Sequence, residues 1–205
     1  MTRIIAGTAR GRTLRTPKGD ATRPTSDRVR EALFSSVEAL ASLDGMRVLD
    51  LYAGSGALGL EAWSRGAGAV AFVEADRRTA DLIRDNARAV GCTSATVTAR
   101  SVATTLAEPA AEPFDLVFSD PPYPLAEERL AADLAALATG WLAPEALIVI
   151  ERSSRSPEPT WPTGISPLPG KRGQRRYGET TLWFAEPTPE PTPDPSAAAD
   201  AVEHS

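Results

Sequence analysis

Short apolar runs alternate with segments of helical periodicity along the middle of the chain. The runs are about five residues long, a usual strand length, and they read RVLDL, AVAFVEA, ATVTA, FDLVFS and ALIVIE. One intervening segment places Ala80, Ile83, Ala87 and Val90 at helical spacing before Gly91, a residue type common at helix ends. This alternation predicts an α/β fold in which helices cover both faces of a parallel sheet. In such a sheet, ligands bind beyond the carboxyl ends of the strands.

The length of 205 residues suits one domain of ordinary size. No apolar run approaches the roughly 18 residues that span a bilayer, and too few apolar residues follow Arg3 for a signal peptide. We therefore expect a cytoplasmic protein without a membrane contact. Cys92 is the single cysteine and His204 the single histidine, so we expect no disulfide and no metal site, with any acid–base chemistry coming from carboxylates or backbone groups.

Charge is distributed unevenly around a net value of −5. Residues 1–30 hold eight Lys and Arg residues against two Asp residues, whereas the segment from residue 186 holds five acids and no Lys or Arg. We expect three regions: a basic N-terminal hairpin over residues 1–24, with a turn from Gly7 to Gly11, a main domain over residues 25–185, and a disordered proline-rich acidic tail over residues 186–205.

A glycine-rich turn links the first predicted inner strand to a helix. The stretch DLYAGSGALGLE places Gly54, Gly56 and Gly59 in a G-x-G-x-x-G pattern, and Glu74 ends the next strand 20 residues after Gly54. Glycines let the backbone approach a ligand, a helix N-terminus supplies N–H groups, and an acid at the second strand can bind both ribose hydroxyls. The order of these features predicts a cofactor that contains adenosine.

Asp50 separates two classes of such cofactor. An acid four residues before Gly54 would repel the pyrophosphate of a dinucleotide. S-adenosylmethionine has no phosphate and carries an ammonium and a sulfonium, which an acid attracts. The sequence therefore favours S-adenosylmethionine. The alternative is that Asp50 only caps the turn and the glycines only allow close packing.

The stretch FSDPPYPL follows the fourth inner strand and should end at the same edge as the glycine turn. Asp120 and the Pro121 carbonyl can each accept one N–H of a planar amine, and Pro121 and Pro122 fix the backbone around them. Tyr123 offers a face on which a flipped base can stack. The turn is thus a predicted clamp for an exocyclic amino group, and the alternative is a rigid turn with an incidental acid. Carbon methylation through a covalent adduct is disfavoured, because Cys92 is distant in sequence.

Several stretches together resemble the bacterial 16S ribosomal RNA guanine-N2 methyltransferases over about residues 2–185: RIIAGTARGRTL, RPTSDRVREALF, LDLYAGSGALGLEAWSRGA, FVEAD, SDPPY and RRYGETTL. The resemblance implies a seven-stranded class I, Rossmann-like methyltransferase fold with an N-terminal β-hairpin extension. It also implies S-adenosylmethionine as the methyl donor and methylation of N2 of one guanine in 16S rRNA.

The resemblance assigns roles by position. It implies that the donor is held by Asp50, Tyr52, Ala53, Gly54, Gly56 and Glu74, that Thr25 and Arg28 close over its methionine end, and that Asp120 to Tyr123 hold the guanine. Many related enzymes bind the adenine amino group with an acidic or amide residue after the third strand. Here that stretch holds Ser101 and Val102, so we expect recognition through the Ser101 hydroxyl or the backbone.

Basic residues at two places become candidate RNA contacts, because phosphate contacts supply much of the affinity for nucleic acid. These residues are Arg3, Arg10, Arg12 and Arg15 in the N-terminal hairpin, and Lys171 and Arg172 near the C-terminus. As charge runs alone, both groups equally fit a solvated face. The expected partner is 16S rRNA, in the small ribosomal subunit or an assembly intermediate, and we expect a monomer. Two alternatives stay open: an adenine-N6 or protein-amide methyltransferase with the same clamp, and a donor-dependent RNA-binding module without turnover.

Overall fold

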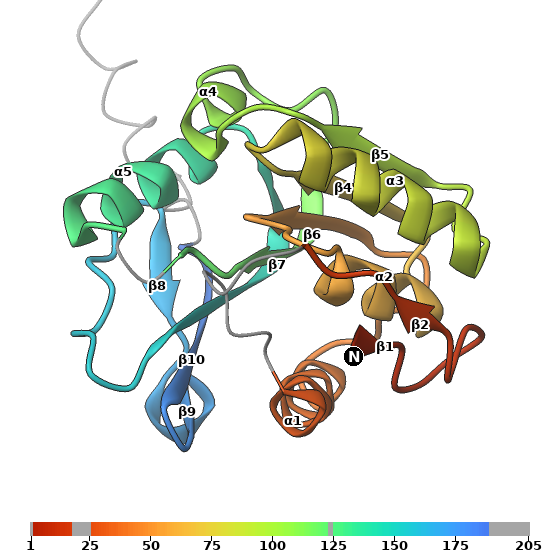
Figure 1. The fold of residues 1–205 in the computed structure, drawn as a ribbon. Coiled ribbons are helices and arrows are strands. Elements are labelled where there is room, and N and C mark those ends of the chain that lie inside the picture. The colour runs from red at the N-terminus through yellow and green to blue at the C-terminus, as the bar shows by residue number, and fades with distance from the viewer. Residues whose placement is uncertain (1, 18–25, 123–124, 189–205) are drawn as a thin grey trace, which may run out of the picture.

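The computed structural model describes residues 2–17, 26–122 and 125–188. Thr25, Tyr123 and the predicted tail from residue 189 lie outside the described residues. Helices cover both faces of a central twisted sheet (Figure 1). The elements are β1 (Thr2–Arg3), β2 (Thr13–Leu14), α1 (Asp27–Glu38), β3 (Arg47–Leu51), α2 (Ala57–Ser64), β4 (Ala69–Val73), α3 (Arg77–Val90), β5 (Ala95–Thr98), α4 (Val102–Leu106), β6 (Phe114–Ser119), α5 (Glu127–Leu137), β7 (Leu142–Ser153), β8 (Ile165–Pro167), the 3-10 turn η1 (Gly170–Arg172), β9 (Gln174–Tyr177) and β10 (Thr180–Pro187).

The central sheet has the strand order β5-β4-β3-β6-β7-β10-β8. This path confirms the predicted seven strands, and within the described residues β9 adds an eighth by pairing with β10. The strands from β5 to β7 are parallel, whereas β10 is antiparallel to β7, β8 and β9. The predicted parallel pairing is therefore confirmed for the inner strands, and β9 and β10 form an antiparallel hairpin at this edge. A turn as short as Gly178-Glu179 reverses the chain and allows only antiparallel pairing.

Two apolar cores lie on opposite faces of the sheet. Successive residues of β6 alternate between them, with Phe118 in the core under α1, α2 and α3 and Val117 in the core under α4 and α5. Phe34 of α1 packs edge-on against Phe118, with ring centroids 5.5 Å apart. The strands are apolar on both sides because both faces are covered.

Two connections next to the sheet have defined local structure. The stretch after Ser101 contains the short helix α4, which the sequence did not indicate and which Ser101 caps through the Thr104 N–H. Helix α5 ends at Leu137, and Leu142 already begins β7. Gly140 has a left-handed φ of 82°, which ends helical geometry before that strand.

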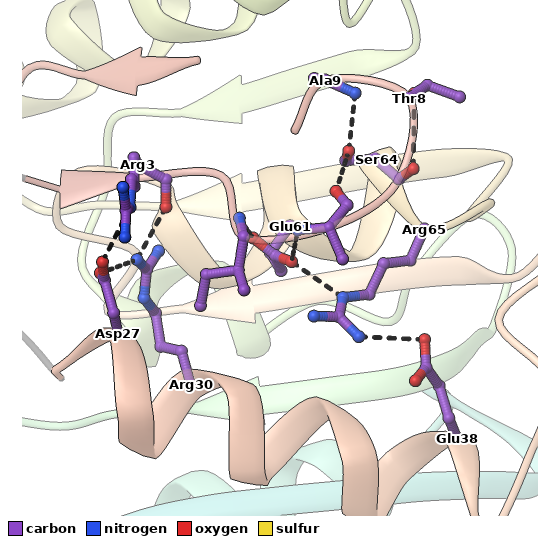
Figure 2. A network of polar contacts seen from close by, with 11 residues as sticks. Arg3, Thr8, Ala9, Asp27, Arg30, Glu38, Glu61, Ser64 and Arg65 are labelled. Carbon is purple, nitrogen blue, oxygen red and sulfur yellow. Dashed lines mark hydrogen bonds and ion pairs between the residues drawn. The ribbon is translucent and has the colours of Figure 1, made fainter. Parts of the chain in front are cut away.

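The N-terminal hairpin is bonded to α2 (Figure 2). Strands β1 and β2 pair antiparallel as predicted. The buried Glu61 carboxylate accepts the N–H groups of Ile5 and Ala6 at 2.7 and 2.9 Å. Ser64 Oγ donates to the Ala6 carbonyl at 2.6 Å and accepts the Ala9 N–H at 2.9 Å. The hairpin therefore shares an interface with the predicted domain over residues 25–185. At the other end of the chain, the predicted start of the tail at residue 186 falls inside β10.

Arginines join α1 to the same network. Arg65 donates to Glu61 at 2.8 Å and to Glu38 of α1 at 3.1 Å, and its guanidinium lies over the Phe34 ring. At the other end of α1, the buried Arg30 donates to the Arg3 carbonyl at 2.7 Å (Figure 2). Hairpin, α1 and α2 thus form one packed unit beside the glycine turn.

Two glycine variants test how closely the hairpin packs against α2. Gly7 and Gly11 both have left-handed φ values, 78° and 82°. A Cβ on Gly7 would stand 1.7 Å from the Ser64 carbonyl oxygen, whereas one on Gly11 would meet nothing within 4 Å. We expect Gly11→Ala to cost about 1–2 kcal/mol from backbone strain alone, and Gly7→Ala to cost about 1–3 kcal/mol more from the clash. Free energies of unfolding from urea titrations check this, and equal losses would contradict the account.

Candidate active site

The glycine turn after β3 has an unusual backbone. Tyr52, Gly54 and Gly56 all have left-handed φ values, of 57°, 55° and 76°. This conformation is costly for a bulky residue such as Tyr52, and strain of this kind concentrates at functional sites. A Cβ on Gly54 would come no closer than 3.9 Å to another atom, the Tyr52 carbonyl oxygen. The outer side of Gly54 therefore has room for a ligand to approach the backbone.

Gly59 serves close packing. A Cβ there would stand 2.4 Å from Phe72 Cε1 and 2.7 Å from Val70 Cγ1, so only glycine lets α2 lie this close to β4. The alternative interpretation of the glycines thus holds at Gly59. It does not describe Gly54, where the surrounding space is open.

Asp50 lies beneath the turn. Its side chain is buried, and its Oδ2 accepts the Gly59 N–H at 2.9 Å. Burial, joined by the negative charge of Glu74, raises the pKa of Asp50 to about 8, although the Gly59 N–H opposes the shift. Asp50 therefore supports the first turn of α2. Its predicted contact with the ammonium of a donor stays a prediction.

Glu74 stands half-buried just after β4, where the sequence placed it. Its Oε2 accepts the Gly54 N–H at 3.0 Å, and its Oε1 accepts the Asp76 N–H at 2.9 Å. Each carboxylate oxygen has two lone pairs, so each has the capacity for a second hydrogen bond. The carboxylate is thus fixed by backbone donors in an orientation compatible with binding two hydroxyls.

Tyr52 points toward α5. Its hydroxyl donates to Asp133 Oδ2 at 2.5 Å, and Asp133 is 4% exposed. Burial and the Asp133 carboxylate raise the pKa of Tyr52 well above its usual value, so the phenol keeps its proton. Sequence reasoning missed Asp133. The available signal was its place among Leu130, Leu134 and Leu137, because an acid on an apolar helix stripe requires a buried partner.

The Asp-Pro-Pro turn, Asp120 to Pro122, begins beside the glycine turn, and we call it the acceptor turn after its predicted role. Strands β3 and β6 are parallel neighbours, and Leu51 and Ser119 are paired in register. The next residues, Tyr52 and Asp120, thus leave the sheet at the same edge, about one strand spacing of 4.8 Å apart. Asp120 is half-buried, Pro121 is buried and Pro122 is exposed. Ala53 lies in this edge too, where its N–H bonds the Val73 carbonyl at 3.1 Å.

Ser101 and Val102 follow β5 at the same side of the sheet. The Ser101 hydroxyl accepts the Thr104 N–H at 3.2 Å and shares a hydrogen bond with the Thr104 hydroxyl at 2.7 Å. The Val102 side chain is buried against the core of α4 and α5. The hydroxyl is thus already used as a helix cap. The adenine contact predicted for both residues stays a prediction.

The candidate RNA-contacting residues differ in their surroundings. Arg3 pairs with Asp27 at 3.1 Å, and Arg15 lies 3.7 Å from Asp85. All six candidates are exposed, and the other four are Arg10 and Arg12 in the N-terminal hairpin and Lys171 and Arg172 in η1. Arg3 and Arg15 already have a carboxylate beside them, so the other four are better placed to meet a phosphate. Arg28, predicted to contact the donor, is exposed on the first turn of α1.

The described residues hold neither a cluster of metal ligands nor a membrane-spanning helix. Within residues 2–17, 26–122 and 125–188, no three His, Cys, Asp or Glu side chains gather as a metal site would require. In the same ranges, no helix has the length and apolar character that crossing a membrane demands.

The buried Asp50 predicts a pH dependence of stability. A carboxyl whose pKa rises from 3.8 to about 8 on folding stabilises the folded state most below pH 4, and this contribution is lost as the pH rises toward 8. Asn keeps an oxygen for the Gly59 N–H and does not ionise. We therefore expect the free energy of unfolding of Asp50→Asn to rise relative to wild type between pH 4 and 8, and to level off above. The control is the exposed Asp81→Asn, and identical pH profiles for Asp50→Asn and wild type would contradict the assignment.

Known proteins resemble this chain in sequence and fold. A family model described as Conserved hypothetical protein 95 matches residues 2–186. The Ribosomal RNA small subunit methyltransferase D of Haemophilus influenzae is 39% identical over 160 residues, covering 76% of this chain and 80% of that protein. The protein of the same name from Escherichia coli K12 is 39% identical over 168 residues, covering 80% and 81%. The solved structure of the Escherichia coli protein yhhF has a TM-score of 0.78 and 34% identity, covering 92% of this chain and 98% of that one.

The family model extends over both turns and both apolar cores. The seven-strand path, with an antiparallel β10 inserted between β7 and β8, confirms the predicted class I fold. The resemblance found in the sequence is confirmed as well. The chain is a methyltransferase that belongs to the ribosomal RNA small subunit methyltransferase D family.

Proposed function

We propose that the protein transfers a methyl group from S-adenosylmethionine to the exocyclic N2 of a guanine in small-subunit ribosomal RNA. The observation that carries the proposal is the register of β3 and β6, which puts the glycine turn and Asp120 at adjacent strand ends. The names of the relatives in Haemophilus influenzae and Escherichia coli support ribosomal RNA as the substrate.

The residues of the glycine turn fit the donor. Gly54 has open space beside its backbone, and the fixed Glu74 carboxylate suits the two hydroxyls of a ribose. Asp50 holds the first turn of α2 in place through Gly59. When bound, S-adenosylmethionine supplies an electrophilic methyl group on a positively charged sulfur.

The acceptor turn orients the guanine. In the proposal, the Asp120 carboxylate accepts one N–H of the exocyclic amine and the Pro121 carbonyl accepts the other. Both bonds draw the nitrogen lone pair out of conjugation with the ring and aim it toward the glycine turn. Asp120 then takes the proton that the amine loses. Tyr123, outside the described residues, is proposed as the stacking surface for the base.

Methylation of defined RNA tests this directly. Purified protein is incubated with labelled donor and small subunits that lack the modification, and the nucleosides are then analysed. We expect N2-methylguanosine. N6-methyladenosine would show that the clamp serves another amine, and donor binding without any methylated nucleoside would show a binding module.

Replacing Asp120 separates the two halves of the site. We expect Asp120→Ala to lower kcat by about 100-fold or more, because the amine loses its orientation, while the affinity for S-adenosylmethionine stays unchanged in calorimetry. Glu128→Ala, an exposed acid on the first turn of α5, is the matched control and keeps wild-type turnover. A comparable loss of donor binding in Asp120→Ala would show that the residue belongs to the donor half.

The exposed hairpin arginines are proposed phosphate contacts. Each such contact contributes roughly 0.7–0.9 to the slope of log affinity against log salt. We expect Arg10→Gln with Arg12→Gln to weaken RNA binding at low salt and to flatten that slope by nearly 2. Arg88→Gln, an exposed arginine of α3, should leave the slope unchanged. An unaltered slope in the double variant would remove the hairpin from the RNA interface.

A further inference from the structure

Helix α5 is attached to the ends of the two strands that flank β6, the strand that leads into the acceptor turn. In the sheet, β6 lies between β3 and β7. Tyr52, just after β3, bonds Asp133 of α5, and Arg152, near the end of β7, pairs with Glu127 of α5. The two attachment points lie six residues apart on the helix, about 9 Å along its axis. One rigid element thus touches both sides of the site.

The first attachment belongs to the glycine turn. Tyr52 is the residue with left-handed φ that begins this turn, and its hydroxyl reaches the buried Asp133. Arg129, one turn earlier on α5, lies 3.2 Å from Asp133 and balances its charge. The strained backbone at Tyr52 needs a restraint to persist. The bond to α5 supplies one.

The second attachment belongs to the acceptor turn. Ser119 of β6 pairs with Ile150 of β7, so Arg152 lies two residues further, level with Pro121. Arg152 is 5% exposed, and its Nη2 donates to Glu127 Oε1. Glu127 is the first residue of α5, five residues after Pro122. The acceptor turn therefore follows directly from the sheet, and the ion pair fixes the start of the helix that comes after the turn.

The ion pair is poorly suited to stabilisation alone. Within the described residues, Arg152 Nε and Glu127 Oε2 are both buried without a hydrogen-bond partner. Trp183 Nε1, on the β10 residue paired with Ile150, shares this condition. Buried ion pairs with unsatisfied atoms contribute little net stability and often less than apolar replacements. A role in position accounts better for such a pair.

We infer that α5 sets the spacing between the glycine turn and the acceptor turn, through the Tyr52–Asp133 bond and the Glu127–Arg152 pair. We call these two links the α5 bridge, and its four members are positioning residues. Its consequence for turnover rests on the proposed function. Transfer requires reacting atoms about 3–3.5 Å apart, and a shift of about 1 Å costs roughly 100-fold in rate.

Hydrogen exchange of the full chain tests the bridge without any activity. The Leu125 N–H, bonded to the Pro122 carbonyl at 2.9 Å, reports on the acceptor turn, and the Gly56 N–H, bonded to the Ala53 carbonyl at 2.7 Å, reports on the glycine turn. We expect Arg152→Met to speed exchange at Gly56 about fivefold or more, and Tyr52→Phe to do the same at Leu125, within the usual range of coupling between linked residues.

The control weakens α5 but keeps both links. Leu137→Ala removes a buried side chain at the far end of the helix, and rates are compared at equal free energy of unfolding, set with urea. Arg152→Lys, which keeps the charge, should restore part of the protection at Gly56. Exchange that rises only in the turn next to each substitution, or that rises equally in Leu137→Ala, would overturn the inference.

Kinetics separate this inference from the proposed function. If the wild-type protein is active, Tyr52→Phe and Arg152→Met should each lower kcat by about 10- to 100-fold. Arg152→Met should leave the donor Kd and the KM for RNA unchanged. The fold-loss in kcat of the double variant should be smaller than the product of the two single fold-losses, because both changes release the same helix. Absence of methyl transfer by wild type would refute the proposed function and leave the exchange result to decide the bridge. A fold-loss in kcat of the double variant equal to the product of the two single fold-losses would contradict the bridge in a working enzyme.

Discussion

The pairing of β3 with β6 is the constraint on which the site depends. Leu51 and Ser119, 68 residues apart in sequence, are fixed side by side by parallel hydrogen bonding. Parallel strands have their carboxyl ends at the same edge of the sheet. The residues that follow the two strands therefore lie near each other because the strands pair, and no bond between the two turns is needed. The two apolar cores that cover this sheet then keep water from its hydrogen bonds. The arrangement of the two turns at the edge of the sheet thus depends on the packing of these two cores.

Around this pairing, buried polar groups hold the flanking segments. Asp50 bonds the Gly59 N–H below the glycine turn, and Glu61 bonds the hairpin backbone on the outer side of α2. Each has a cost in desolvation that its hydrogen bonds offset. Such groups contribute less to net stability than to a unique arrangement of backbone. The inferred α5 bridge on the opposite face of the sheet would act in the same way.

Much of this organisation followed from sequence, because local patterns carry it. Apolar runs of strand length, the order strand-glycines-helix-strand-acid, and the Asp-Pro-Pro turn are all readable within short windows. The helix α4 was missed, since a five-residue element carries little periodic signal. Glu61, Asp133 and Arg152 were missed for a different reason. Their partners lie 25 to 81 residues away, and a single sequence gives no measure of such pairing.

Asp50 has a structural role that the sequence pattern did not assign to it. The folded chain buries its side chain, which accepts a backbone N–H of α2, and the predicted donor contact stays a prediction. Glu74 occupies the position expected of it, at the end of β4.

A crystal structure with bound S-adenosylmethionine is the most direct test of whether the two turns lie side by side in one site. The account predicts the donor against Gly54 and Glu74, with its sulfur on the order of 6–8 Å from the Asp120 carboxylate. A donor bound at any other edge of the sheet would contradict it.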